Sequence, residues 1–174
     1  VTKDGYSSDQ TYPISISNPN PTKTDTTILS GQVTQVSFSI DLLSNLTFHT
    51  LSQACGVIPN IGLQVSGSKL IGTPNLLKFS NTFTSNSSGV VPLSNIEWDN
   101  YTPELISSAY MVYGSSPVQQ VSVLPNTTQG FNLILGPKTN NSLLVIVLDA
   151  GTKNPLEGAT VTLQSIWTKV TGGS

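Results

Sequence analysis

Apolar and polar residues alternate in several short segments, and this period of two constrains the fold more than any other feature. One such series, which predicts a strand within residues 1–42, is Val36, Phe38, Ile40 and Leu42, with polar residues between them. A period of two puts one side of an extended chain into a core and leaves the other side in water. No stretch has the period of an amphipathic helix. The pattern therefore predicts an all-β fold.

We predict seven short strands, near residues 45–51, 61–66, 76–83, 90–94, 104–112, 119–124 and 130–135. Segments rich in Gly, Pro, Asn and Ser separate them and are typical of turns. Seven strands with regular punctuation favour a two-sheet Greek-key sandwich, Ig-like or transthyretin-like, over a closed barrel. The expected core is Leu46, Phe48, Leu63, Val65, Leu77, Phe79, Leu93, Ile96, Leu105, Val121, Val123, Phe131 and Leu133.

A hairpin pattern occurs twice in the chain. Residues 142–163 read as a strand, a polar turn and a returning strand, and the Pro-x-x-Gly-x-x-Val spacing of Pro155–Val161 also occurs at Pro59–Val65. A repeat of roughly 100 residues matches the size of a small sandwich domain. We therefore predict three parts: residues 1–42 as the end of a preceding β module plus linker, 43–138 as a complete module, and 139–174 as the first hairpin of a following one.

The segment LLVIVLDAGTKNPLEGATVTL, residues 143–163, resembles the opening hairpin of carboxypeptidase-regulatory-like, transthyretin-like modules. Residues 84–101 resemble the turn, strand and aromatic-ended loop in the middle of such a module, and residues 1–6 resemble its late strand. These modules are strung along bacterial secreted, cell-surface and prepilin-like proteins. The resemblance implies an extracellular location, and neighbouring modules or another copy of the chain as partners.

Composition narrows the classes of function. Charged residues make up only 9% of the chain, the net charge is −2, and all seven basic residues are Lys. Nucleic-acid binding therefore has no electrostatic support. No apolar run approaches the roughly 18 residues that a membrane span needs. The hydrophobic fraction of 37% is sufficient for a core, and the uncharged polar remainder suits the exposed faces of antiparallel strands.

Few residues have side chains suited to catalysis or metal binding. His49 is the only histidine and is expected to face solvent, and no Gly-x-Ser-x-Gly segment accompanies it. Cys and His do not cluster as a zinc site requires, and acidic residues are scattered singly. We therefore expect no catalytic residue, metal or cofactor, and no enzymatic activity. Cys55, the only cysteine, is predicted to be buried as a small hydrophobic residue, with an intermolecular disulfide as the alternative.

Aromatic residues supply the candidate binding surface. Glu97 and Asp99 flank Trp98, a pattern that admits a glycosidase-like carboxylate pair, but we favour aromatic residues plugging one end of the sandwich with the acids in solvent. The candidates for stacking on a sugar ring are Trp98, Tyr101, Tyr110 and Tyr113. The predicted function is a stalk or spacer module of a bacterial surface or pilus-like protein. The alternative is an adhesin or carbohydrate-binding module whose partner is a surface glycan or a host protein.

Overall fold

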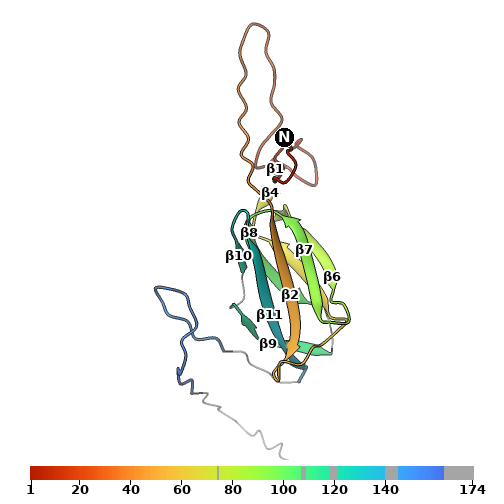
Figure 1. The fold of residues 1–174 in the computed structure, drawn as a ribbon. Coiled ribbons are helices and arrows are strands. Elements are labelled where there is room, and N and C mark those ends of the chain that lie inside the picture. The colour runs from red at the N-terminus through yellow and green to blue at the C-terminus, as the bar shows by residue number, and fades with distance from the viewer. Residues whose placement is uncertain (74, 107–108, 118–120, 140–144, 163–174) are drawn as a thin grey trace, which may run out of the picture. The chain divides into compact units, whose positions relative to one another are not determined.

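The computed structural model describes residues 1–73, 75–106, 109–117, 121–139 and 145–162. These residues contain strands, turns and extended segments but no helix, which confirms the all-β prediction (Figure 1). The chain divides into two compact units, Val1–Leu144 and Val145–Ser174. Residues 1–42 thus belong to the same unit as the strands that follow them.

Two four-stranded sheets form the body of the first unit. One has the order β7 (Val90–Ile96), β2 (Ser44–Ser52), β11 (Thr128–Pro137) and β9 (Tyr110–Ser116). The other has the order β10 (Val121–Val123), β8 (Asp99–Leu105), β3 (Gly62–Gly67) and β6 (Ser80–Thr84). Buried residues of both sheets belong to a single hydrophobic cluster, as in a β-sandwich. The two sheets hold eight strands, one more than predicted.

The first and last strands of the sandwich, β2 and β11, pair in parallel. Their register runs over eight residue pairs, from Asn45 opposite Thr128 to Ser52 opposite Leu135. Parallel neighbours cannot be joined by a tight turn, and here the rest of the sandwich connects them. Because both strands run in the same direction, the chain enters the sandwich at one end and leaves it at the other (Figure 1).

The core follows the predicted alternation closely. Inward residues of β2 and β11, including Leu46, Phe48, Phe131 and Leu133, are buried, and the rings of Phe48 and Phe131 meet edge to face. Of the thirteen predicted core residues, Phe79 and Leu105 are only partly buried. Leu77 is 36% exposed because it lies in β5 (Leu76–Leu77), outside the two main sheets. The core also includes residues that were not predicted: Ile61, Val91, Tyr101 and Leu135.

A third, smaller sheet joins the N-terminal residues to the sandwich. It has the order β1 (Asn20–Pro21), β4 (Leu70–Thr73) and β5. The predicted strand 76–83 is thus divided between β5 in this sheet and β6, which begins at Ser80. Asn18 supports the pairing of β1 with β4, since its amide Nδ2 donates to the carbonyl of Ile71. An isolated bridge between Tyr6 and Leu42 closes this N-terminal part of the chain.

Two predicted strands are wrong. The alternating segment at 36–42 forms no strand, and Val33 nearby is 98% exposed. An alternating segment is stabilised as a strand only when it pairs with the edge of a sheet and buries its apolar side in a core. Residues 36–42 do neither. The predicted strand 104–112 is in fact the end of β8 at Leu105 and the start of β9 at Tyr110.

Cys55 is exposed, contrary to the prediction. It lies in the turn that follows β2, where its backbone N–H donates to the carbonyl of Ser52 and its φ is +59°. A residue in this left-handed conformation sits at the tip of a turn, so its side chain points away from the sandwich core.

The second unit contains a turn where the sequence predicts one. The carboxylate of Asp149 accepts hydrogen bonds from the backbone N–H groups of Gly151 and Thr152 and from the Thr152 hydroxyl. These bonds lower the pKa of Asp149 below its ordinary value. Leu148 pairs with Pro155 in a single bridge, and the described residues 145–162 form no longer strand. Part of the predicted hairpin 143–163 lies outside the described residues.

Candidate functional site

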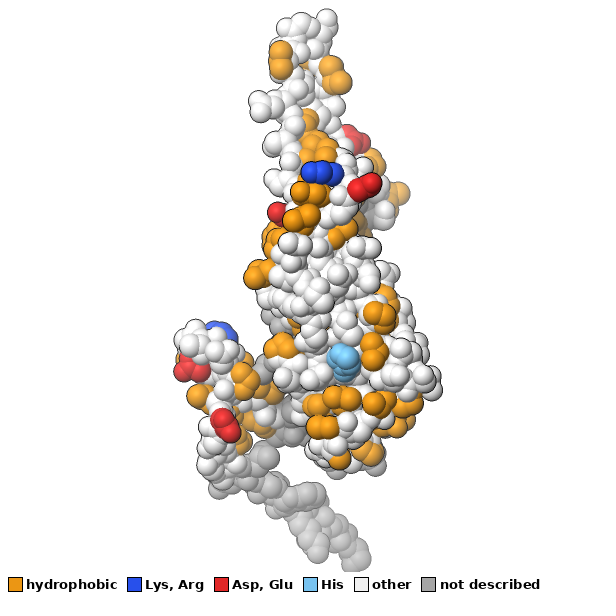
Figure 2. All heavy atoms as spheres, in the orientation of Figure 1, with side chains coloured by type: hydrophobic (Ala, Val, Ile, Leu, Met, Phe, Trp, Pro, Cys, Tyr) orange, Lys and Arg blue, Asp and Glu red, His pale blue; other side chains and the backbone are white. Residues whose placement is uncertain are grey.

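The charged residues of the sandwich gather at one of its ends. Residues 44–137 contain five charged side chains, Lys69, Lys78, Glu97, Asp99 and Glu104. The first four lie around the loops that meet residues 1–43. On the face shown in Figure 2, the charged side chains of the first unit lie over this N-terminal part of the chain, while the rest of the described part of that unit is white and orange apart from the pale-blue histidine. In a chain with so few charged residues, their concentration at this end of the sandwich makes it a candidate functional site.

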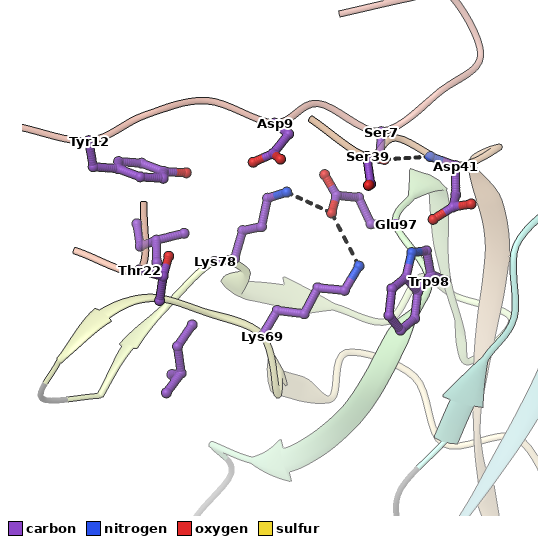
Figure 3. Close-up of a pocket in the computed structure, with 12 residues that line it drawn as sticks. Ser7, Asp9, Tyr12, Thr22, Ser39, Asp41, Lys69, Lys78, Glu97 and Trp98 are labelled. Carbon is purple, nitrogen blue, oxygen red and sulfur yellow. Dashed lines mark hydrogen bonds and ion pairs between the residues drawn. The ribbon is translucent and has the colours of Figure 1, made fainter. Parts of the chain in front are cut away.

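Glu97 is the centre of the cluster. Its Oε2 lies 2.8 Å from Nζ of Lys78 and 3.5 Å from Nζ of Lys69, and all three side chains are more than two thirds buried (Figure 3). Its Oε1 accepts a hydrogen bond of 3.3 Å from the backbone N–H of Ser8. Lys78 also donates to the carbonyl of Ser8. Glu97 therefore ties residues 1–12 to the loops of the sandwich and is not a solvated acid, contrary to the sequence prediction.

Asp99 is buried and fully engaged. Its Oδ1 accepts hydrogen bonds from the Ser68 hydroxyl at 2.6 Å and the Asn100 N–H at 2.7 Å, and its Oδ2 accepts one from the Lys69 N–H at 3.1 Å. A Cβ at Gly67 would lie only 2.3 Å from Oδ2, so glycine allows this approach. Asp99 holds the turn between β3 and β4, and this carboxylate is not available as half of a catalytic pair.

Trp98 lies in the turn between β7 and β8 and is 42% exposed. The ammonium of Lys69 lies 3.6 Å from the centroid of the indole ring. Burial of Lys69 lowers its pKa, against the opposing effect of Glu97 and Asp99. The cation and the ring attract each other, and this contact holds the indole in position at the surface.

The other three predicted aromatic residues do not join Trp98. Tyr101 is only 1% exposed, its ring packs edge to face on Phe79, and its hydroxyl donates to the carbonyl of Glu97. Burial, together with the nearby carboxylates of Asp99 and Glu97, raises the pKa of this phenol. The predicted assignment of Tyr101 to a stacking surface is therefore wrong. It lies on the inward side of β8, where the period of two puts it in the core.

Tyr110 and Tyr113 lie on β9, in the sheet opposite to β8. Tyr110 packs against the core cluster. The ring of Tyr113 lies directly over Gly136 of β11. A Cβ added at Gly136 would lie only 1.5 Å from Cε2 of this ring. Both rings are partly buried. Among the four candidates, Trp98 alone is classed as exposed.

The N-terminal residues form one wall of a hollow of about 280 Å³ that also reaches Lys69, Lys78 and Trp98. Asp9 is held there by Lys23, whose Nζ lies 2.6 Å from its Oδ2, and this contact lowers the pKa of Asp9. Ser7 and Asp41 exchange hydrogen bonds through their backbones and the Ser7 hydroxyl. This wall is not predictable from the sequence, because nothing in residues 1–42 indicates that they fold back onto the loops around Glu97.

No protein-family model matches the chain, and comparisons with curated proteins and with solved structures give no significant match. Among the described residues, no three His, Cys, Asp or Glu side chains group as metal ligands, and no helix is long and apolar enough to cross a membrane. His49 is half buried in β2, on the side opposite to the core residues.

Proposed function

We propose that residues 43–138 are a non-enzymatic spacer module of a bacterial extracellular surface or pilus-like protein, with an Ig-like or transthyretin-like Greek-key sandwich. In this proposal residues 1–42 fold onto the sandwich within the same unit, and residues 139–174 belong to a neighbouring module of the same protein or pair with another copy. The parallel pairing of β2 with β11 is the observation that carries the proposal. A chain that enters at one end and leaves at the other can be joined in series without doubling back.

The same pairing has a mechanical consequence. A force that pulls residue 43 away from residue 138 acts along β2 and β11 in opposite directions. All of the hydrogen bonds of the eight-pair register then bear the load together in shear. If the force acted on both strands at one end, it would break these bonds one after another. The sandwich is therefore expected to resist tension along the direction in which a stalk would be pulled.

The surface also suits a spacer. The outward residues of β2 and β11 include Asn45, Thr47, Thr128 and Asn132, and none of these is charged. The interactions of a neutral polar surface depend little on ionic strength. This is useful to a protein exposed to a medium whose salt concentration changes.

Single-molecule pulling of the chain tests this proposal. In a Cys55→Ser background, handles attached at Leu43→Cys and Lys138→Cys load β2 and β11 in shear. We expect these molecules to unfold at a force several times higher than molecules pulled through Leu43→Cys and Thr128→Cys, where both handles are at the same end of the two strands. The force at which a molecule unfolds depends on its unfolding rate. The two pairs of handles therefore compare the unfolding barriers of the same fold in two pulling directions.

Equilibrium denaturation of both cysteine variants is the control, and the two should have the same stability. If the Leu43–Lys138 pair unfolded at the same force as the Leu43–Thr128 pair, or at a lower one, the parallel strands would not bear load. The proposed role as a force-bearing spacer would then be wrong.

A further inference from the structure

Two hollows meet at Trp98. The first, of about 280 Å³, is walled by the N-terminal residues, and the second, of about 380 Å³, lies beside β8 and β10. Trp98 and Lys69 line both of them. The hollows are near the lower end of the range for small-molecule sites, roughly 300–1,000 Å³. The most exposed of the four candidate aromatic rings thus stands between two recesses.

The walls around the indole carry hydrogen-bonding groups of every kind. Near the indole these are the hydroxyl of Ser7, the carboxylate of Glu97 and the ammonium of Lys69 (Figure 3). Tyr12 and Thr22 line the side of the same hollow that is away from Trp98 (Figure 3). Glu97 and the two lysines that pair with it hold one another in position. A ligand in this recess would therefore meet fixed donors and fixed acceptors next to an apolar ring.

Three carboxylates and two ammonium groups line this hollow, and Lys23, outside the lining, neutralises Asp9. The near-neutral charge that results restricts the ligand. Each lysine that could attract an anion is already paired with Glu97, and the carboxylates of Asp9 and Asp41 share the same wall. A cation would meet the two ammonium groups. A neutral ligand with many hydroxyl groups needs no net charge, since each hydroxyl donates to a carboxylate and accepts from an ammonium group or another hydroxyl.

Trp98 supplies the remaining part of such a site. An indole presents a large apolar face at a small entropic cost, with a polar N–H at its edge. The C–H groups of a sugar ring can lie on that face while its hydroxyls reach the walls. Lys69 covers one face of the indole at 3.6 Å, so a ligand would meet the other face or the edge.

We propose that Trp98, with Glu97 and Lys78, forms a binding site for a neutral saccharide at the end of the sandwich that meets residues 1–43. The site is independent of the spacer function, because a chain can bear load through β2 and β11 whether or not these hollows are occupied. It also differs from the predicted aromatic set, since Tyr101 is buried and Tyr110 and Tyr113 lie on the other sheet.

The test is binding of the full chain to neutral oligosaccharides of glucose, galactose, mannose and N-acetylhexosamine units, followed by titration of each hit by NMR. We expect at least one saturable ligand that shifts the indole N–H signal of Trp98. Trp98→Ala should weaken its binding by about tenfold or more, a loss of roughly 1.4 kcal/mol. Trp98→Phe, which keeps an aromatic face, should weaken it less.

Tyr113→Ala is the matched control, because it removes an aromatic ring from β9 and should leave binding unchanged. Retention of the wild-type amide spectrum by Trp98→Ala confirms that this variant is folded. The proposal is overturned if no neutral oligosaccharide binds, if only acidic ones such as uronates bind, or if Tyr113→Ala abolishes binding and Trp98→Ala does not. If the saccharide proposal is overturned in this way, the expected result of the pulling experiment does not change.

Discussion

Thr50 is a polar residue at a fully buried position of β2. Its hydroxyl lies 2.5 Å from the carbonyl of Ile58 and 3.1 Å from that of Gly89, and its relative exposure is 0%. Ser85, also buried, accepts a hydrogen bond from the N–H of Ile61 through its hydroxyl. These two side chains bind backbone groups of two loops, 53–61 and 85–89, at one end of the core, which apolar residues could not do.

We expect Thr50→Val to destabilise the sandwich by about 1–2 kcal/mol, because valine has the same shape but removes the hydroxyl that donates to the carbonyl of Ile58. Urea denaturation at equilibrium measures the difference. Thr47→Val is the control: it makes the same change on the outward side of the same strand and should cost less than about 0.5 kcal/mol. Equal losses for the two variants would show that strand propensity, and not the buried hydroxyl, determines the effect.

Glycine has a defined role at two residues. Gly89 has a φ of +68°, and a Cβ there would lie 2.8 Å from the carbonyl oxygen of Thr50, so the turn after Asn86 needs glycine for both conformation and space. Asn86 completes this turn by accepting hydrogen bonds from the N–H groups of Ser88 and Val90. Residues 87–89, between two predicted strands, thus form a turn because Gly89 adopts a positive φ and the Asn86 side chain binds the backbone of the turn.

At the scale of elements, β9 and β11 are coupled by one close contact. Their register shifts between Ile134 and Leu135, and next to this irregularity the ring of Tyr113 lies over Gly136. The Tyr113 hydroxyl donates to the carbonyl of Pro137 at 3.3 Å. The missing side chain at Gly136 therefore makes room for a ring that covers the backbone near the end of β11.

We expect Gly136→Ala to destabilise the sandwich by about 1–3 kcal/mol, the usual cost of overpacking, because the new methyl group displaces the ring of Tyr113. In a Tyr113→Ala background the same change should cost much less. Equilibrium denaturation of the four proteins of this double-mutant cycle measures the coupling. The same cost for Gly136→Ala in both backgrounds would mean that backbone strain, and not the ring, is responsible.

At the scale of the whole unit, residues 1–43 are attached to the sandwich largely by polar contacts. Lys78 and Glu97 hold Ser8, and the side-chain amide of Asn18 donates to the carbonyl of Ile71. Within residues 1–43 themselves, Lys23 pairs with Asp9 and donates to the carbonyl of Ser37. Partly exposed pairs of this kind contribute little each and weaken when one partner loses its charge. The attachment is thus expected to be less stable than the core.

Acid should loosen the contacts within residues 1–43 before it unfolds the sandwich. The contact with Lys23 holds the pKa of Asp9 below its ordinary value of 3.8. A depressed carboxyl pKa stabilises the folded state above that ordinary value, and this stabilisation is lost as the pH falls through the lower pKa. We expect hydrogen exchange at the Tyr12 N–H, which donates to Lys23, to lose protection below about pH 4 while Leu63 in β3 stays protected.

Asp9→Asn provides the control for this pH dependence. It removes the titrating group, so exchange at Tyr12 should be faster than in the wild type at neutral pH and should show no further loss of protection between pH 5 and pH 3 beyond the intrinsic change, which follows from linkage. Simultaneous loss of protection at Tyr12 and Leu63 in the wild type would contradict the view that residues 1–43 open before the sandwich unfolds.

The sequence by itself determined the all-β class and most of the core. In β2, the alternation of Leu46 and Phe48 with polar residues specifies a strand and its buried side, because a period of two allows only one face to be apolar. The same reasoning located β11 through Phe131 and Leu133. These are local properties, and each of these strands lies where the sequence predicts it.

The tertiary structure alone decided which segments meet. Val36 and Ile40 alternate as well as Phe131 and Leu133 do, but only β11 finds a partner edge, more than 70 residues away in the chain. Trp98 and Tyr101 are three residues apart, yet one is exposed in a turn and the other is buried in a strand. Pairing, burial and the gathering of charge around Glu97 depend on contacts between distant residues. The local period of a sequence carries no information about such contacts, because it fixes which side of a strand is apolar but not what that side packs against.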